Sequence, residues 1–63
     1  MATITLSNGE QKQAELPCYV LQAYFNGKWN NLEVHPCTEQ GFKDAIGGYN
    51  RYDFKDMQVQ TFR

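Results

Sequence analysis

The chain has 63 residues and a formal net charge of −1, from 6 basic and 7 acidic residues. This length predicts a single domain over residues 1–63, with a core too small to enclose a cofactor pocket of the usual ~300 Å³ or more. The charges are interspersed and form no basic stripe, so direct binding to nucleic acid is not expected. No apolar run approaches the ~18 residues of a membrane span, and no secretory signal precedes the domain. With only two cysteines, we expect a reduced protein of the cytoplasm.

The first segment, residues 1–6, alternates between polar and apolar side chains and predicts a strand. A turn signal follows at Ser7-Asn8-Gly9-Glu10. We expect a three-residue loop that pairs Ile4 with Ala14 and makes residues 10–16 a weak edge strand. This loop is favoured over a two-residue turn because it places apolar side chains beside each other.

The strongest local signal is a β-hairpin over residues 18–35. Two apolar-rich runs flank Asn26-Gly27, the dipeptide that supplies the two positive φ values of a type I′ turn. A two-residue loop with uninterrupted pairing places Tyr24 opposite Trp29, Leu21 opposite Leu32, and Tyr19 opposite Val34.

This register gives the hairpin two different faces, because successive side chains of a strand point to opposite sides. The apolar face is expected to cover the core and carries Tyr19, Leu21, Ala23, Phe25, Leu32 and Val34. The other face is mostly polar and carries Val20, Gln22, Tyr24, Trp29, Asn31 and Glu33.

A helix follows the hairpin. Thr38 is a suitable N-cap, and Phe42, Ala45, Ile46 and Tyr49 recur at the spacing of one helix face. We place the helix from Glu39 to about Tyr52. It includes Gly47-Gly48, where the missing side chains would let a strand or a partner approach closely.

Residues 57–62 alternate again and predict a terminal strand. The element order is therefore two strands, the hairpin, the helix and a last strand. It predicts an α+β fold, with one helix packed on one face of an antiparallel sheet of about four strands. Residues 10–16 or 57–62 would form an uncovered sheet edge, which favours a homodimer.

Cys18, His35 and Cys37 are expected at one end of the hairpin, with Cys18 opposite His35. A structural zinc site needs four ligands, and this set supplies three without a C-x₂-C spacing. A thiol–imidazole pair would need an orienting group and a cleft, and the two thiols could form a disulfide if they faced each other. The favoured interpretation is a buried thiol, an exposed thiol and a surface histidine, with no metal and no cofactor.

No pair of carboxylates indicates acid–base catalysis, so we expect a binding protein rather than an enzyme. Tyr24 and Trp29 would form an exposed aromatic pair on the outer face, and these residue types dominate binding hot spots. The alternative is that the pair only stabilises the hairpin. The candidate binding residues are Tyr24, Trp29, Asn31 and Glu33, followed by Tyr49, Arg51 and Tyr52.

The run Tyr19-Val20-Leu21-Gln22-Ala23-Tyr24, then Gly27, Trp29 and Leu32, with Tyr49-Asn50-Arg51 ending the helix, resembles small uncharacterised phage-encoded proteins. The resemblance covers residues 19–62. The sequence departs from it at Gly47-Gly48 and in the more polar last strand. The resemblance implies an inhibitor of host defence, such as an anti-CRISPR protein, that acts in the bacterial cytoplasm on a host protein or ribonucleoprotein complex. The alternative is a small nucleic-acid-binding module that stacks bases on the sheet-face aromatics.

Overall fold

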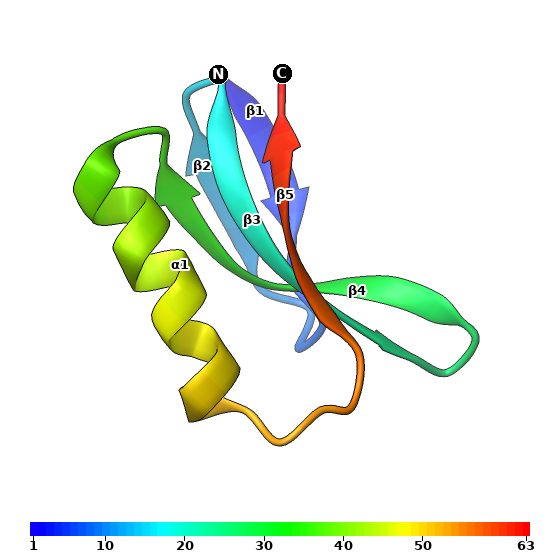
Figure 1. Ribbon diagram of the computed structural model, residues 1–63. Coiled ribbons are helices and arrows are strands. Elements are labelled where there is room, and N and C mark those ends of the chain that lie inside the picture. Colours follow the sequence, from blue (N-terminus) through cyan, green and yellow to red (C-terminus); the bar gives the residue numbers. More distant parts are fainter.

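The computed structural model describes residues 1–63 as five strands and one helix (Figure 1). The α+β class, the element order and the helix on one sheet face are confirmed. The strands form two antiparallel sheets, β1-β2 and β4-β3-β5, rather than one sheet of about four. No helix has the length and apolarity needed to cross a membrane. The elements are β1 (Ala2–Thr5), β2 (Gln11–Ala14), β3 (Cys18–Phe25), β4 (Lys28–Pro36), α1 (Glu39–Arg51) and β5 (Met57–Phe62).

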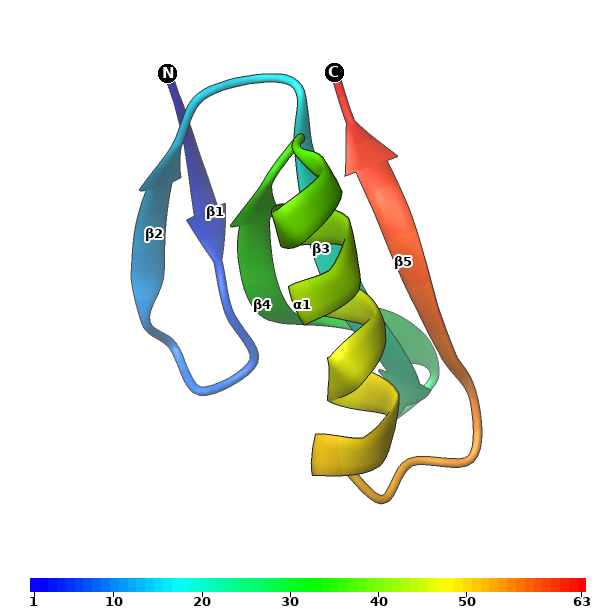
Figure 2. The same ribbon diagram turned by 60° about the vertical axis from the view of Figure 1, so that its left-hand side comes forward.

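The central strand β3 is covered on both faces. Helix α1 lies over one face of the three-stranded sheet, and the β1–β2 hairpin lies over the other (Figures 1 and 2). Val20, Leu21 and Ala23 are completely buried, although successive residues point to opposite faces. On the side of the β1–β2 hairpin, Val20 packs in one cluster with Ile4, Leu6 and Cys18. The fold therefore has three layers, and the expectation that Val20 lies on a solvated face is wrong.

The β3–β4 register changes in the middle of the hairpin. Near the turn, Tyr24 lies opposite Trp29 and Gln22 opposite Asn31, as predicted. The pairing then shifts, so that Leu21 lies opposite Glu33 and Val20 opposite Val34. Leu32 is the extra residue of this β-bulge, since two residues on one strand there oppose one on the other. The expected pairs of Leu21 with Leu32 and of Tyr19 with Val34 are wrong.

The bulge is explained by the third layer. Without it, Glu33 would share a face with the fully buried Val20, and its carboxylate would face the apolar cluster under the β1–β2 hairpin. Burying an unpaired carboxylate there would be costly. The inserted residue instead turns Val34 toward that cluster, against which it packs, and turns Glu33 toward α1.

The β1–β2 hairpin has the expected three-residue loop, but its pairing differs from the prediction. The Leu6 amide donates to the Glu10 carbonyl at 2.7 Å, with Gly9 in the left-handed region at φ 87°. Counting outward from this pair places Ile4 opposite Lys12. The expected pairing of Ile4 with Ala14 is therefore wrong by two residues, and Ala14 pairs with Ala2 instead.

The bounds of α1 agree with the prediction. The Thr38 hydroxyl accepts a hydrogen bond from the Gly41 amide at 3.0 Å, and Tyr52 is the C-cap residue. The buried face is different, because it consists of Gly41, Ala45 and Gly48. These small residues let the helix lie close to the sheet. The larger apolar residues of the predicted stripe are half-exposed on its flank: Phe42, Ile46 and Tyr49.

Because α1 lies close to β3, alanine substitutions at the two adjacent glycines should change stability in opposite directions. A Cβ added at Gly48 would overlap the Leu21 Cδ2, whose side chain is fully buried and has little room to move. Gly48→Ala should therefore lower the free energy of unfolding by about 1–3 kcal/mol, as overpacked core substitutions do. Urea denaturation of the two proteins measures the difference.

The control for this prediction is Gly47→Ala. A Cβ at Gly47 would approach only the Arg51 Nη1, at 3.0 Å, a nitrogen at the tip of a half-exposed side chain. Alanine is favoured over glycine inside a helix by about 1 kcal/mol, so this variant should be as stable as the wild type or more stable. Equal stability of the two alanine variants would show that α1 does not lie against Leu21.

Candidate functional site

Tyr24 and Trp29 form the exposed aromatic pair that the hairpin register predicts. Their ring centroids are 5.4 Å apart with an interplanar angle of 74°, an edge-to-face contact. The side chains remain 45% and 42% exposed. The hairpin end that carries them extends beyond α1 and the β1–β2 hairpin (Figure 1). We call the Tyr24–Trp29 pair with the Asn26-Gly27 turn the aromatic tip.

Asn31 has a structural role next to the aromatic tip. Its side-chain amide donates to the Thr5 carbonyl at 3.1 Å, and its backbone carbonyl accepts from the Ser7 backbone amide at 2.8 Å. Its side-chain oxygen accepts from Gln22 at 2.9 Å, and Gln22 in turn accepts from Gln58 at 2.8 Å. A line of amides thus crosses the three-stranded sheet and joins it to β1. Asn31 fixes the base of the tip rather than extending its free surface.

Glu33 lies on the opposite face from Trp29, so its expected place in the outer patch is wrong. The bulge turns it toward α1, where Arg51 donates to both carboxylate oxygens at 3.1 and 2.5 Å. The His35 Nε2 is 2.7 Å from the same carboxylate. Arg51 also donates to the Asp44 carbonyl at 2.7 Å, which holds the guanidinium along the helix. Glu33, His35 and Arg51 form a network that attaches α1 to β4.

The network changes the pKa values of its members. Burial alone would raise the pKa of Glu33, but the hydrogen bonds from Arg51 and His35 and the nearby Tyr52 outweigh it and lower that pKa. The Glu33 carboxylate raises the pKa of Arg51 in return. The pKa of Tyr52 is raised by burial and by the same carboxylate. Three of the predicted binding residues, Glu33, Arg51 and Tyr52, therefore lie together, and they contact one another within the chain.

Phe54 supports the aromatic tip and has no counterpart among the predicted site residues. It stacks on Phe25 with centroids 5.0 Å apart and an interplanar angle of 7°, and it also contacts Tyr52 at 6.2 Å. Phe25 lies next to Tyr24 in β3 but points to the α1 side. Tyr49, the remaining candidate, is 42% exposed on the flank of α1. The predicted binding residues are thus divided between the two faces of the sheet.

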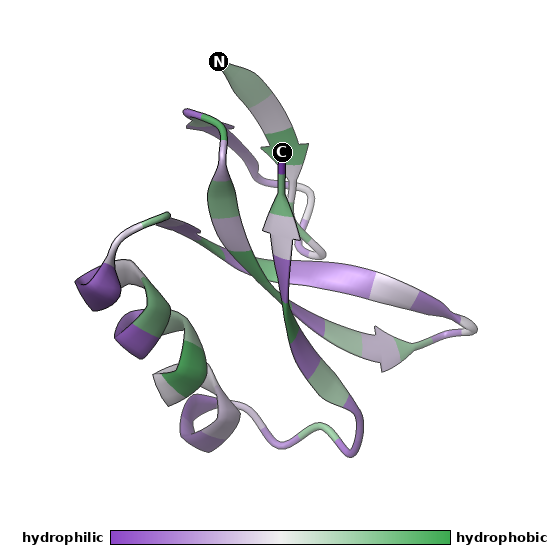
Figure 3. Cartoon of the chain, turned by 45° about the horizontal axis from the view of Figure 1, so that its top comes forward, coloured by the Kyte–Doolittle hydropathy of each residue, from purple (hydrophilic) through white to green (hydrophobic).

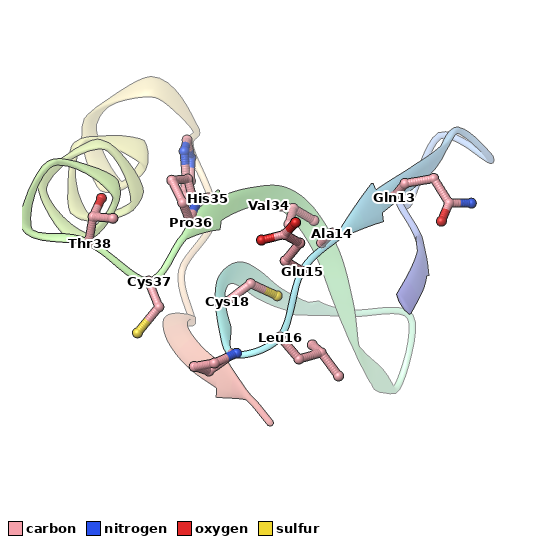
Figure 4. Close-up of a pocket in the computed structure, with 11 residues that line it drawn as sticks. Gln13, Ala14, Glu15, Leu16, Cys18, Val34, His35, Pro36, Cys37 and Thr38 are labelled. Carbon is pink, nitrogen blue, oxygen red and sulfur yellow. The ribbon is translucent and has the colours of Figure 1, made fainter. Parts of the chain in front are cut away.

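Cys18, His35 and Cys37 do not come together as one site. Cys18 lies opposite Pro36 and is buried on the β1–β2 side, whereas His35 lies opposite Tyr19 and points toward α1. Figure 4 shows the two thiols pointing in different directions, with the His35 ring turned away from both. Both cysteines are free. Burial raises the pKa of the Cys18 thiol, and the nearby Cys37 adds to this effect.

An open groove of about 540 Å³ lies between the β2–β3 and β4–α1 connections (Figure 4). Its walls include Leu16, Pro17 and Val34 on the apolar side and Glu15 and Thr38 on the polar side. No group of three or more His, Cys, Asp or Glu side chains is arranged to hold a metal ion. In chemical terms, the groove offers apolar contact with few polar groups directed at one point.

No model of a known protein family matches the chain, and neither the curated proteins nor the solved structures contain a match.

The Glu33 network predicts a specific loss of stability in acid. A carboxylate whose pKa is lower in the folded state stabilises the fold fully above its unfolded value of about 4.3, and that contribution disappears as pH falls through the folded pKa. Glu33→Gln should cost about 1–3 kcal/mol at neutral pH, because hydrogen bonds to a charged group are lost. The cost should shrink as the pH is lowered below about 4. Thermal melts over this pH range measure it.

Glu15→Gln is the matched control, since Glu15 is exposed and forms no ion pair. It should follow the wild-type melting temperature at every pH. If Glu33→Gln also did so, the ionic contact between α1 and β4 would contribute nothing to stability.

Proposed function

We propose that this protein is a non-enzymatic inhibitor that binds a host protein or ribonucleoprotein complex through the aromatic tip. The class of partner follows from the sequence resemblance, which implies a bacterial host defence system such as a CRISPR–Cas complex. The observation that supports binding at the tip is the exposure of Tyr24 and Trp29 on a projecting hairpin.

The chemistry of the tip suits a protein interface. Trp and Tyr supply large contact areas at low conformational cost, and they are enriched among hot-spot residues. Lys28 and Asn26 lie beside them in the turn and add a polar rim. The edge-to-face contact orders the two rings before binding, which reduces the entropy lost on association.

The support beneath the tip also favours binding. The stacked Phe25 and Phe54 back the hairpin on the α1 side, and Asn30 donates to the Phe25 and Lys28 carbonyls at 3.0 and 2.9 Å. These contacts hold the hairpin end in one shape although no other layer covers it. A preorganised projection of this kind fits a concave surface on a partner.

Trp29→Ala tests the proposal because it separates folding from binding. Trp29 is 42% exposed, so its truncation should cost little stability, whereas Leu21→Ala should cost about 2–5 kcal/mol because Leu21 is fully buried. Binding to a purified defence complex should weaken by about 2–4 kcal/mol, the range of hot-spot truncations. Calorimetric titration of the complex that the wild type captures from bacterial lysate measures the loss.

Leu16→Ala is the control, because Leu16 is 44% exposed, close to the exposure of Trp29, but lies in the β2–β3 connection, away from the tip. It should leave capture unchanged. The proposal fails if Trp29→Ala binds as tightly as the wild type. It also fails if single-stranded DNA or RNA binds the tip with an affinity that falls steeply with salt, the behaviour of a nucleic-acid-binding module.

A further inference from the structure

Strand β5 is an edge strand that lacks the usual protection. It pairs only with β3, and its other side faces no strand (Figure 2). Its six residues Met57–Phe62 contain no charge, no proline and no bulge. Natural sheets normally protect an edge with one of these devices, because unpaired backbone groups recruit another strand.

The other strand edges are protected. β4 carries the bulge at Leu32, and the Ser7 amide already bonds its Asn31 carbonyl. β1 and β2 have only four residues each, and β2 includes Lys12. β5 is therefore the one edge of the molecule that is long, regular and uncharged.

The backbone groups that β5 leaves free can be identified. The Tyr24 amide donates to the Asp56 carbonyl at 2.9 Å, in line with the β3–β5 register. Tyr24 and Asp56 therefore form a hydrogen-bonded pair, and such pairs alternate along an antiparallel ladder. Met57, Val59 and Thr61 lie at the intervening positions, so their N–H and C=O groups point to the free edge.

We propose that β5 pairs antiparallel with β5 of a second copy of this chain, about a two-fold axis at Val59. With Val59 opposite Val59 of the second copy, Met57 lies opposite Thr61. This register satisfies every outward N–H and C=O of these three residues in both copies. A shift by two residues would leave some of them unpaired, which makes the Val59-centred register the best fit.

The free groups of β5 favour a second copy as the occupant. They lie at Met57, Val59 and Thr61, evenly spaced about Val59, so an identical antiparallel strand matches each outward donor with an acceptor. Met57–Phe62 carries no charge that would oppose the pairing.

The flank of α1 supplies the apolar part of the interface. Phe42, Ile46 and Tyr49 are 44%, 39% and 42% exposed, and they lie on the side of the helix away from the Arg51 contact with β4. That side faces β5, whose Met57, Val59 and Thr61 point to the α1 layer because they lie opposite Ala23, Leu21 and Tyr19. Figure 3 shows the apolar residues of α1 gathered on its sheet side.

A stable dimer needs more contact than the pairing of two β5 strands supplies. A standard interface buries ~800 Å² per partner, roughly a fifth of the 4322 Å² accessible surface of this chain. Strand pairing alone would not cover that area. The two-fold axis is perpendicular to the joined sheet, so both helices lie on the same face and their exposed flanks approach each other across the joint.

Sedimentation equilibrium of the wild type tests the dimer directly. The expected result is a monomer–dimer equilibrium that shifts with dilution. Ile46→Lys should weaken the dimer at least about tenfold, because a charged group would be buried without a partner. Gln40→Lys makes the matching change on the opposite flank of α1, beside Asp44, and should leave the equilibrium unchanged. A wild type that stays monomeric at all concentrations overturns the proposal, as does equal weakening by the two variants.

Cross-linking tests the register. In a Cys37→Ser background, Val59→Cys places two thiols at the two-fold axis. Directly paired Cα atoms there are about 5.5 Å apart, within the range of a disulfide. Gln60→Cys is the control, because Gln60 would face Gln58 of the second copy. Mild oxidation should link Val59→Cys rapidly and Gln60→Cys slowly, with thermal melts confirming that both variants are folded. Equal rates would contradict the Val59-centred register.

Discussion

The extra residue at Leu32 determines which side chains share a face along β4. Before it, Trp29 and Asn31 point away from α1 with Tyr24 and Gln22 of the neighbouring strand. After it, Val34 points to the same face as Trp29 and Asn31, and Glu33 points toward α1. In an uninterrupted strand, Glu33 would point to the face of Asn31 instead. Both remaining layers depend on this change. The β1–β2 hairpin packs against an apolar surface, and α1 meets a carboxylate that its Arg51 can bind.

The three layers give a short chain more buried surface than one helix on one sheet would. A domain of about 60 residues buries only about 60% of the surface of its unfolded chain. Covering β3 on both faces makes Cys18, Val20, Leu21 and Ala23 fully buried along a single strand. Close approach at Gly41 and Gly48 adds to this, since small residues let the helix backbone lie near the sheet. The larger side chains of α1 are displaced to its flank, where they remain half-exposed.

Local signals in the sequence were sufficient for the elements but not for their pairing beyond the turn. Asn26-Gly27 identified the turn and its neighbouring pairs, and Thr38 identified the start of α1. The bulge depends on the docking of the β1–β2 hairpin, a contact between residues distant in sequence that no periodicity shows. The predicted face of Glu33 was wrong for the same reason, because one inserted residue moves every later side chain to the other face. Of the candidate binding residues, Tyr24 and Trp29 occupy the predicted arrangement. Phe54 was not among the candidates, because it lies in a connection without a periodic pattern.

The bulge is tested most directly by nuclear Overhauser contacts from the Val34 methyl groups. The structure places Val34 opposite Val20 and against the cluster that contains Ile4. Strong contacts are therefore expected from the Val34 methyl groups to the methyl groups of Val20 and Ile4. Contacts from Val34 to the Tyr19 ring instead, without any to Ile4, would indicate an uninterrupted hairpin and contradict the three-layer arrangement.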